Sequence, residues 1–170
     1  GKLIRATRRP PIVVSGGGGV PINFGEVGDV TSINTDLLNS LLAADLVPVI
    51  ASLGINDNGD VFNINADTTV IQIARKMSAE LLIFVTGIGG IFEDIKDPAS
   101  RFAQLDPAAA RKHIDSGIIV DGMIPKVEEA ISLLESDVDT IAIVDTRDPL
   151  AFTSIASGET QFGTLISNKA

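Results

Sequence analysis

The stretch Leu81-Leu82-Ile83-Phe84-Val85, which ends at Thr86, decides the fold class of this chain. It is apolar at every position, as in a strand that is covered on both faces of a sheet. A second run of this kind, Ile141-Ala142-Ile143-Val144, lies further along the chain. Both runs have the length of a strand and are far too short to cross a membrane. They predict a largely parallel sheet that is buried between helices.

Segments with helical spacing alternate with such strands. This spacing predicts helices from about Asn34, from Ala66 to Met77, from Asp106 to Ser116, from Ile124 to Glu135 and near 149–156. Further strands are expected at 12–14, 47–51 and 163–166, and a hairpin is expected at 53–64 around Asp57-Asn58-Gly59-Asp60. The alternation predicts an α/β sandwich.

The first part of the chain is expected to differ from the rest. Residues 1–28 are predicted to form an irregular, hairpin-like lead-in, and residues 29–170 a single lobe. The run Gly16–Gly19 could be a phosphate-binding loop or a flexible turn. No Gly-Lys-Ser/Thr follows it, and Pro21 lacks a backbone N–H that such a loop would use, so the flexible turn is favoured.

Composition excludes several classes of function. Among 170 residues there is no Cys and one His, which excludes disulfide scaffolds, thiolate metal sites and Cys nucleophiles and leaves little room for a Ser-His-Asp triad. A formal net charge of −9 argues against a nucleic-acid partner. We find no export signal or membrane segment, and a cytoplasmic location is expected.

The segment Asn63-Ile64-Asn65-Ala66-Asp67 places polar side chains at alternate positions where a predicted strand meets a helix. Ligands gather at the carboxyl ends of strands in α/β sheets, so Asn63, Asn65 and Asp67 are candidate site residues. The alternative is structural: Asn65 caps the helix, and Asp67 stabilises its first turn. The residues alone leave both interpretations open.

Lys126 is a candidate anion-binding residue. It lies in the first turn of a predicted helix, where a cation opposes the helix dipole and lowers stability slightly. A bound phosphate would use both its charge and the helix N–H groups, whereas the alternative is a solvated surface lysine. The turn Thr86-Gly87-Ile88-Gly89-Gly90 follows a buried strand and could line a ligand with its backbone.

Taken together and in this order, several segments resemble the C-terminal part of the N-acetyl-L-glutamate kinases, of the amino acid kinase family. The resemblance covers nearly the whole chain from about Asp29. It is carried by Val27-Gly28-Asp29-Val30, Ile33-Asn34-Thr35-Asp36-Leu37-Leu38, Val47-Pro48-Val49-Ile50-Ala51, Asn63-Ile64-Asn65-Ala66-Asp67, Gly122-Met123-Ile124-Pro125-Lys126-Val127-Glu128 and Gly163-Thr164.

The resemblance implies a three-layer α/β/α sandwich with a mainly parallel sheet, in which residues 29–170 form a nucleotide-binding lobe. It implies transfer of the ATP γ-phosphoryl group to the side-chain carboxylate of N-acetyl-L-glutamate, in arginine synthesis. Mg²⁺ would be held mainly by the nucleotide, without metal-binding side chains, and the full-length enzyme would be a homo-oligomer.

The resemblance also implies roles for individual residues. Lys126 and Asp67 would be catalytic: Lys126 would neutralise charge on the phosphoryl group, and Asp67 would hold catalytic lysines. Asn63 and Asn65 would bind the amino-acid substrate. The nucleotide-binding residues would be Thr86, Gly87, Gly89, Gly90, Met123 and Lys126.

Several differences from the family motivate alternatives. The family's N-terminal half supplies a second lysine, glycine-rich phosphate loops and a substrate-binding arginine, so this chain alone is expected to be inactive. Gly87 stands where the family usually has Asp, and glycines common between the family's elements are replaced here, for example by Asp45, Ser136 and Asp137. The segment 145–149 also lacks the His typical of arginine-inhibited members. The alternatives are a non-catalytic nucleotide-sensing or assembly module, or a related kinase with another acyl amino acid substrate.

Overall fold

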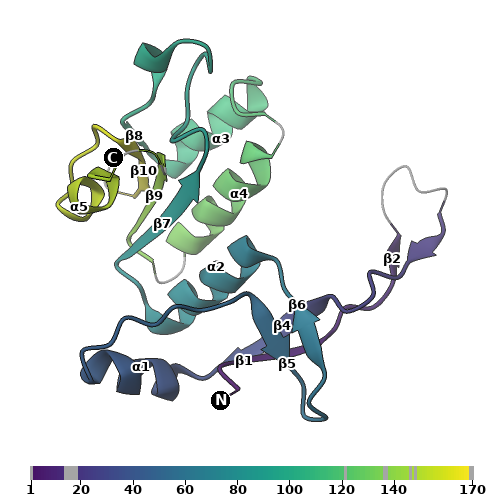
Figure 1. The fold of residues 1–170 in the computed structure, drawn as a ribbon. Coiled ribbons are helices and arrows are strands. Elements are labelled where there is room, and N and C mark those ends of the chain that lie inside the picture. The colour runs from purple at the N-terminus through teal and green to yellow at the C-terminus, as the bar shows by residue number, and fades with distance from the viewer. Residues whose placement is uncertain are drawn as a thin grey trace. The chain divides into compact units, whose positions relative to one another are not determined.

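The computed structural model describes residues 2–13, 19–120, 122–135, 138–145, 147 and 149–168. The predicted turn at 16–19 falls outside these residues, except for Gly19. The chain divides into two compact units, Gly1–Met77 and Ser78–Ala170, and each is described by itself (Figure 1).

Unit 1 is built on a four-stranded mixed sheet with the order β4-β1-β5-β6. Strand β1 runs antiparallel to β4 and parallel to β5, and β5 and β6 are antiparallel. A separate antiparallel ribbon, β2-β3, projects from this sheet (Figure 1). The strands are β1 (Ile4–Arg8), β2 (Ile12–Val13), β3 (Pro21–Ile22), β4 (Gly28–Ile33), β5 (Leu53–Ile55) and β6 (Val61–Asn63).

Local signals place the helices and the hairpin of unit 1 as predicted. Helix α1 (Thr35–Ala43) begins after Asn34, whose side chain accepts a hydrogen bond from the N–H of Leu37 at 3.0 Å. The β5-β6 hairpin turns at Gly59, which has a φ of +93°. Helix α2 (Ala66–Met77) has the predicted bounds and packs on β4. The core of the unit is apolar and contains Ile4, Ala6, Phe62 and Ile64.

Two sequence predictions in unit 1 are wrong. Residues 4–8 are not irregular but form β1, whose apolar pattern is short because only Ile4 and Ala6 are buried. Residues 47–51 do not form a buried strand: Val47 and Val49 are 87% and 97% exposed. An apolar run becomes a buried strand only where a neighbouring strand pairs with it, and within the described residues none does.

Unit 2 contains a second four-stranded sheet, with the order β7-β9-β10-β8. The pairs β7/β9 and β8/β10 are parallel, and β9/β10 is antiparallel. The elements are β7 (Leu81–Thr86), the 3₁₀ helix η1 (Pro98–Ser100), β8 (Gln104–Leu105), α3 (Pro107–Asp115), α4 (Met123–Leu134), β9 (Thr140–Asp145), α5 (Ala151–Ala156) and β10 (Gly163–Ser167).

Helices cover both faces of this second sheet. Helix α5 packs on one face, where Ala142 and Val144 lie in one cluster with Ile155. Because side chains alternate along a strand, Ile141 and Ile143 point to the opposite face, and α4 contacts β9 and β10 there. Figure 1 shows α5 on one side and α3 and α4 on the other. The predicted α/β class and its helix–sheet–helix layering are confirmed, with parallel pairs inside mixed sheets.

Coverage of β7 is less complete than its apolar sequence predicts. Leu82 and Phe84 are buried, whereas Leu81 and Ile83 are half-buried and Val85 is 42% exposed. Among the described residues, no helix is long and apolar enough to cross a membrane.

Candidate functional site

The carboxyl ends of β7 and β9 lie side by side in unit 2. These strands are parallel, and their register pairs Thr86 with Asp145 at that end. In α/β folds, ligands bind in the crevices outside the carboxyl ends of parallel strands. The turns that follow Thr86 and Asp145 are therefore the first place to search for a site.

A cavity of about 590 Å³ opens at this end of β7, and we call it the β7 cavity. Its walls are mainly apolar, and the first turn of α4 contributes one side. It brings together five of the predicted nucleotide-binding residues. The full lining is Thr86, Gly87, Ile88, Gly90–Ile95, Ile118–Val120, Gly122, Met123 and Lys126.

Lys126 supplies the positive charge of the β7 cavity. It is half-buried, and its Nζ lies 5.6 Å from the centre of the buried Phe84 ring, within range of a cation–π interaction. Gly122 is the N-cap residue of α4 and provides no side-chain cap. The N-terminal end of a helix carries unsatisfied N–H groups and partial positive charge. Lysine and helix end together favour an anion at this wall of the cavity, which Glu93 and Asp94 also line.

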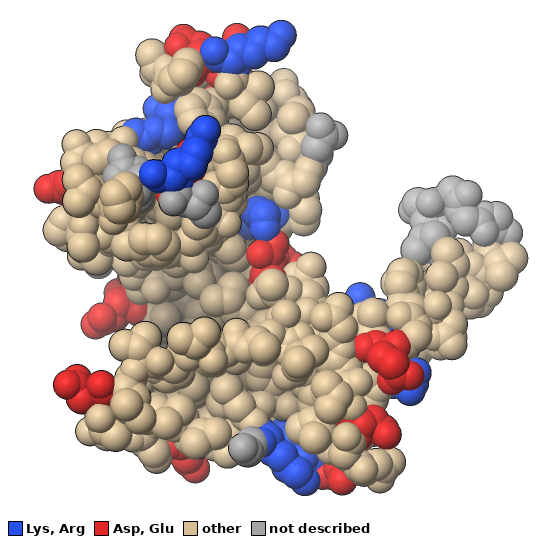
Figure 2. Space-filling view, viewed as in Figure 1, with Lys and Arg blue, Asp and Glu red and all other residues tan. Residues whose placement is uncertain are grey.

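The positive charge of Lys126 matters for anion binding because the chain as a whole is acidic. The chain carries a formal net charge of −9, and Figure 2 shows acidic and basic side chains interspersed over the visible face. The described residues on that face form no continuous basic surface. An anionic ligand therefore depends on a local cation rather than on the field of the whole protein.

The turn after β7 is shaped by Thr86. Its Oγ1 accepts hydrogen bonds from the N–H groups of Ile88 at 3.3 Å and Gly89 at 3.0 Å. Gly89 has a φ of +78°, and a Cβ there would lie 2.6 Å from the Cβ of Asp145, so the turn approaches β9 closely. At Gly87 a Cβ would meet nothing within 4 Å. The glycine at position 87 is therefore not required by packing.

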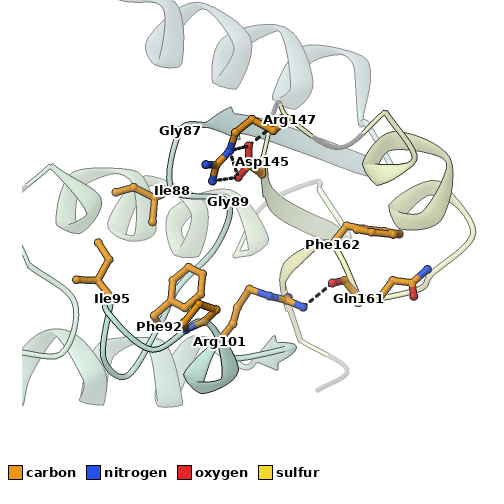
Figure 3. A pocket seen from close by; sticks show the side chains of 11 residues that line it. Gly87, Ile88, Gly89, Phe92, Ile95, Arg101, Asp145, Arg147, Gln161 and Phe162 are labelled. Carbon is orange, nitrogen blue, oxygen red and sulfur yellow. Dashed lines mark hydrogen bonds and ion pairs between the residues drawn. The ribbon is translucent and has the colours of Figure 1, made fainter.

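A second cavity of about 590 Å³ lies beside the first and contains Gly89, the remaining predicted nucleotide-binding residue (Figure 3). We call it the β9 cavity. It shares Gly87, Ile88, Phe92 and Ile95 with the β7 cavity and is otherwise lined by Gly89, Pro98, Arg101, Asp145, Arg147, Gln161 and Phe162.

An ion pair borders the β9 cavity. The Arg147 Nε donates to both carboxylate oxygens of Asp145, at 2.9 and 2.8 Å, and its NH2 also contacts Asp145 (Figure 3). The side-chain hydrogen bonds from Arg147 are the main cause that lowers the pKa of Asp145 to about 2. Arg147, one of the two arginines that line the β9 cavity, is thus paired with a carboxylate.

This ion pair leads to a pH prediction. Because the folded-state pKa of Asp145 is lowered, its contribution to stability is present above the unfolded pKa and is lost as the pH falls through about 2. We expect the carboxyl NMR signal of Asp145 to remain that of the ionised form at pH 3. In Arg147→Leu, the same carboxyl is expected to be half-protonated near pH 4, the ordinary value. Equal midpoints in the two proteins would contradict the ion pair.

The other candidate residues lie in unit 1. Phe62 and Ile64 are buried while Asn63 and Asn65 are exposed, so the two asparagines share a face as predicted. The Asn65 Oδ1 accepts from the N–H of Thr68 at 3.0 Å, which confirms the capping interpretation for this residue.

Asp67 lies half-buried in the first turn of α2. The structure gathers Thr86, Gly87, Gly90, Met123 and Lys126 in unit 2 and the Asn63–Asp67 segment in unit 1. The roles assigned to all of these residues stay predictions.

Sequence reasoning missed several lining residues. Phe92 and Arg101 lie in a stretch without periodicity, and Ile118–Val120 form an apolar run too short to interpret. The glycine at 117, with a φ of +75°, is the signal that could have drawn attention to the run after α3. Among the described residues, no group of three or more His, Asp or Glu side chains is placed to hold a metal.

A family model and curated relatives both relate this chain to the amino acid kinases. The amino acid kinase family matches residues 20–145. The acetylglutamate kinase of Anaeromyxobacter dehalogenans (strain 2CP-C) is 40% identical over 149 residues, covering 88% of this chain and 55% of that protein. That of Sorangium cellulosum (strain So ce56) is 37% identical over 166 residues, covering 98% of this chain and 58% of that protein. The chain thus spans little more than half the length of these curated relatives.

One solved structure supports the fold. N-acetylglutamate synthase from Neisseria gonorrhoeae, complexed with coenzyme A and L-arginine, superimposes with a TM-score of 0.81 at 20% identity. The superposition covers all of this chain and 37% of the synthase chain. At this identity the similarity concerns the fold alone.

Proposed function

Because the chain belongs to the amino acid kinase family, we propose that it is the nucleotide-binding part of an acetylglutamate kinase. The single observation that carries this proposal is the position of Lys126, in the first turn of α4 and at the wall of the β7 cavity. The relatives' name supplies the proposed reaction. In it, the ATP γ-phosphoryl group passes to the side-chain carboxylate of N-acetyl-L-glutamate, as in arginine synthesis.

The proposed chemistry needs no general base. A side-chain carboxylate is already ionised at pH 7, so its oxygen can attack the γ-phosphorus directly. The bond from this phosphorus to the bridging oxygen breaks, ADP leaves with the electron pair, and an acyl phosphate forms. Catalysis then consists of alignment and neutralisation of charge, which the Lys126 ammonium and the N–H groups of α4 would supply. Mg²⁺ would enter with the nucleotide, held mainly by its phosphates.

The lining of the β7 cavity combines a cation with apolar side chains. Lys126 and the helix end suit the phosphates, and the apolar side chains of Ile118–Val120 and Ile91 suit the base. The backbone of the Thr86–Gly90 turn would line the sugar and phosphates. A concave site with apolar walls and a few polar groups is the usual form of a small-molecule site.

The residues of unit 1 would serve the acceptor. Asn63 and Asn65 would bind the amino-acid substrate, and Asp67 would hold catalytic lysines in place. Asn65 is also the cap of α2, and its side-chain N–H₂ group is chemically able to donate to a substrate while its oxygen caps.

Gly87 favours a second candidate function. The position is open enough for an aspartate, yet this chain lacks the carboxylate there. A nucleotide-sensing or assembly module without catalysis would tolerate that loss. A related amino acid kinase with another acyl amino acid substrate is a third candidate.

We expect Mg-ADP to bind to the isolated chain with a dissociation constant below about 1 mM, the usual range for enzyme substrates. Isothermal titration calorimetry measures this, with adenosine as the control that lacks phosphates. Adenosine should bind more weakly, because it cannot use Lys126. Absence of heat at millimolar Mg-ADP would contradict both the kinase and the sensing proposals.

A phosphoryl-transfer assay distinguishes the kinase proposal from the nucleotide-sensing proposal. The chain is assayed with Mg-ATP, N-acetyl-L-glutamate and hydroxylamine, which traps acyl phosphate as a hydroxamate. The assay is run once with this chain alone and once with a second polypeptide added. That polypeptide carries the part of the Anaeromyxobacter relative that has no counterpart here. Hydroxamate in the mixture supports the kinase, whereas nucleotide binding without hydroxamate supports the sensing module.

A further inference from the structure

Residues 87–103 form a long loop, which we call the pocket loop. It leaves the carboxyl end of β7 and returns as an irregular hairpin. The N–H of Phe102 donates to the carbonyl of Ile91 at 2.9 Å, and the N–H of Glu93 donates to the carbonyl of Ser100 at 3.1 Å. The loop contributes lining residues to both cavities. Its position therefore determines the shape of the proposed nucleotide site.

Apolar burial holds this loop only weakly. Within 87–103, Gly89, Gly90 and Ile91 are buried, and Ile91 is the one buried side chain larger than hydrogen. Ile88 and Ile95 are 44% and 65% exposed. A segment with so few buried apolar contacts has low local stability unless polar interactions hold it.

Thr164 provides such an interaction from β10. Its side chain is fully buried, and its Oγ1 donates to the carbonyl of Phe102 at 2.6 Å and accepts from the N–H of Ile91 at 2.9 Å. One hydroxyl thus joins both arms of the pocket loop to the sheet. Without it, a buried N–H and a carbonyl would lose their partner, which costs more than an ordinary hydrogen bond contributes.

Arg101 provides a second interaction from the loop itself. Its guanidinium donates to the carbonyl of Gln161 at 2.7 Å (Figure 3). It also donates to the carbonyls of Thr160, at 2.9 Å, and Gly163. Partial burial of this guanidinium lowers the pKa of Arg101. The planar guanidinium reaches several acceptors at once, which a lysine cannot do.

Glycines permit this close approach. At Gly90 a Cβ would lie 2.9 Å from both the Arg101 Cδ and the Thr164 Oγ1. At Gly163 a Cβ would lie 2.6 Å from the carbonyl oxygen of Ile143. The Gly163-Thr164 dipeptide, one of the segments that carry the family resemblance, thus accepts a hydrogen bond from Arg101 at the Gly163 carbonyl and holds the loop through the Thr164 hydroxyl.

We propose that Thr164 and Arg101 are positioning residues for nucleotide binding: they hold the pocket loop against β10 in the shape that forms the β7 cavity. This inference rests on the proposed function, since it names residues that act on the same site. Neither Thr164 nor the guanidinium of Arg101 needs to touch the nucleotide. Their effect passes through the backbone of Ile91 and Phe102.

Thr164→Val tests the proposal because it keeps the shape of the side chain and removes both hydrogen bonds. We expect the affinity for Mg-ADP to fall about 10-fold, and exchange of the Ile91 amide hydrogen to accelerate by at least as much. Thr164→Ser keeps the hydroxyl and should restore most of both properties. Arg101→Lys should weaken binding several-fold.

Ser154→Ala is the matched control. Ser154 is also nearly buried in unit 2, and its Oγ donates to a carboxylate oxygen of Glu159 at 2.7 Å, but it lines neither cavity. Its loss should lower thermal stability without changing Mg-ADP affinity or exchange at Ile91. A merely structural role for Thr164 would give the same result, and so would overturn the proposal.

The outcomes separate the two proposals. If the wild-type chain binds Mg-ADP and Thr164→Val binds it equally well, the positioning role is wrong and the proposed function stands. If the wild-type chain does not bind Mg-ADP, the proposed function fails and the inference fails with it. If Thr164→Val loses both Mg-ADP affinity and the protection of the Ile91 amide from hydrogen exchange, and Thr164→Ser restores them, the proposed function and the positioning role are both supported.

Discussion

Lys126→Ala is expected to lower phosphoryl transfer by about 10²- to 10³-fold, the usual cost of removing one group that stabilises developing charge. Lys126 lines the β7 cavity from the first turn of α4, where its charge and the helix N–H groups would act on the same phosphate. The measurement is hydroxamate formation in the mixture described above, with Mg-ADP affinity measured by calorimetry. Affinity should also fall, because the nucleotide loses a cation partner.

Lys112→Ala is the control for this substitution. Lys112 is exposed in the last turn of α3 and lines neither cavity, so its removal should leave both measurements unchanged. Circular dichroism checks that both variants are folded, because Lys126 is half-buried and lies within cation–π range of Phe84. Full activity of Lys126→Ala would show that Lys126 has no catalytic role.

Phe62→Ala is expected to lower the free energy of unfolding of unit 1 by about 3–5 kcal/mol. Phe62 is 1% exposed and packs with Ile4, Ala6 and Ile64 at the centre of the small core of this unit. If residue 28 carried a Cβ, that atom would lie 2.6 Å from the Cβ of Phe62. The backbone at Gly28 is thus already packed closely against Phe62 and has little freedom to fill the space that the truncation leaves. Urea unfolding followed by circular dichroism measures the effect.

The matched control for this change is Phe24→Ala. Phe24 is 39% exposed, so the same truncation removes fewer buried contacts and should cost less than about 1 kcal/mol. Similar losses for the two variants would mean that Phe62 is not the centre of the core of unit 1.

Local chemistry explains which parts of the fold could be predicted from sequence. The Asn34 cap, the Gly59 turn and the bounds of α2 depend on neighbours in the chain, and all three are confirmed. Strand β1 depends on its partner β4, and its own residues carry almost no apolar alternation. The error at 47–51 has the opposite cause: its apolar pattern is strong, but strand formation requires a partner that the pattern cannot supply.

The residues of the candidate site also fall into two groups: those that local sequence patterns predict, and those that only contacts distant in the sequence reveal. The turn after β7 and the first turn of α4 were found by their glycines and by a lysine placed against the helix dipole, and the structure brings them together. Arg101 and Thr164 were not found as site residues, because their importance comes from partners about 60 residues away in the sequence, as in the bond from Arg101 to Gln161. No local pattern encodes such a contact.

The segment 46–51, which forms neither helix nor strand, also bears on how the protein behaves in concentrated solution. Its valines at 47 and 49 lie almost entirely in water, and the segment carries no charge. Exposed, uncharged, β-prone runs are templates for self-association through strand pairing. Pro48 stands between the two valines and has no N–H to donate, so it interrupts the row of donors that an incoming strand would need. We therefore expect Pro48 to hinder strand pairing of this segment between copies of the chain.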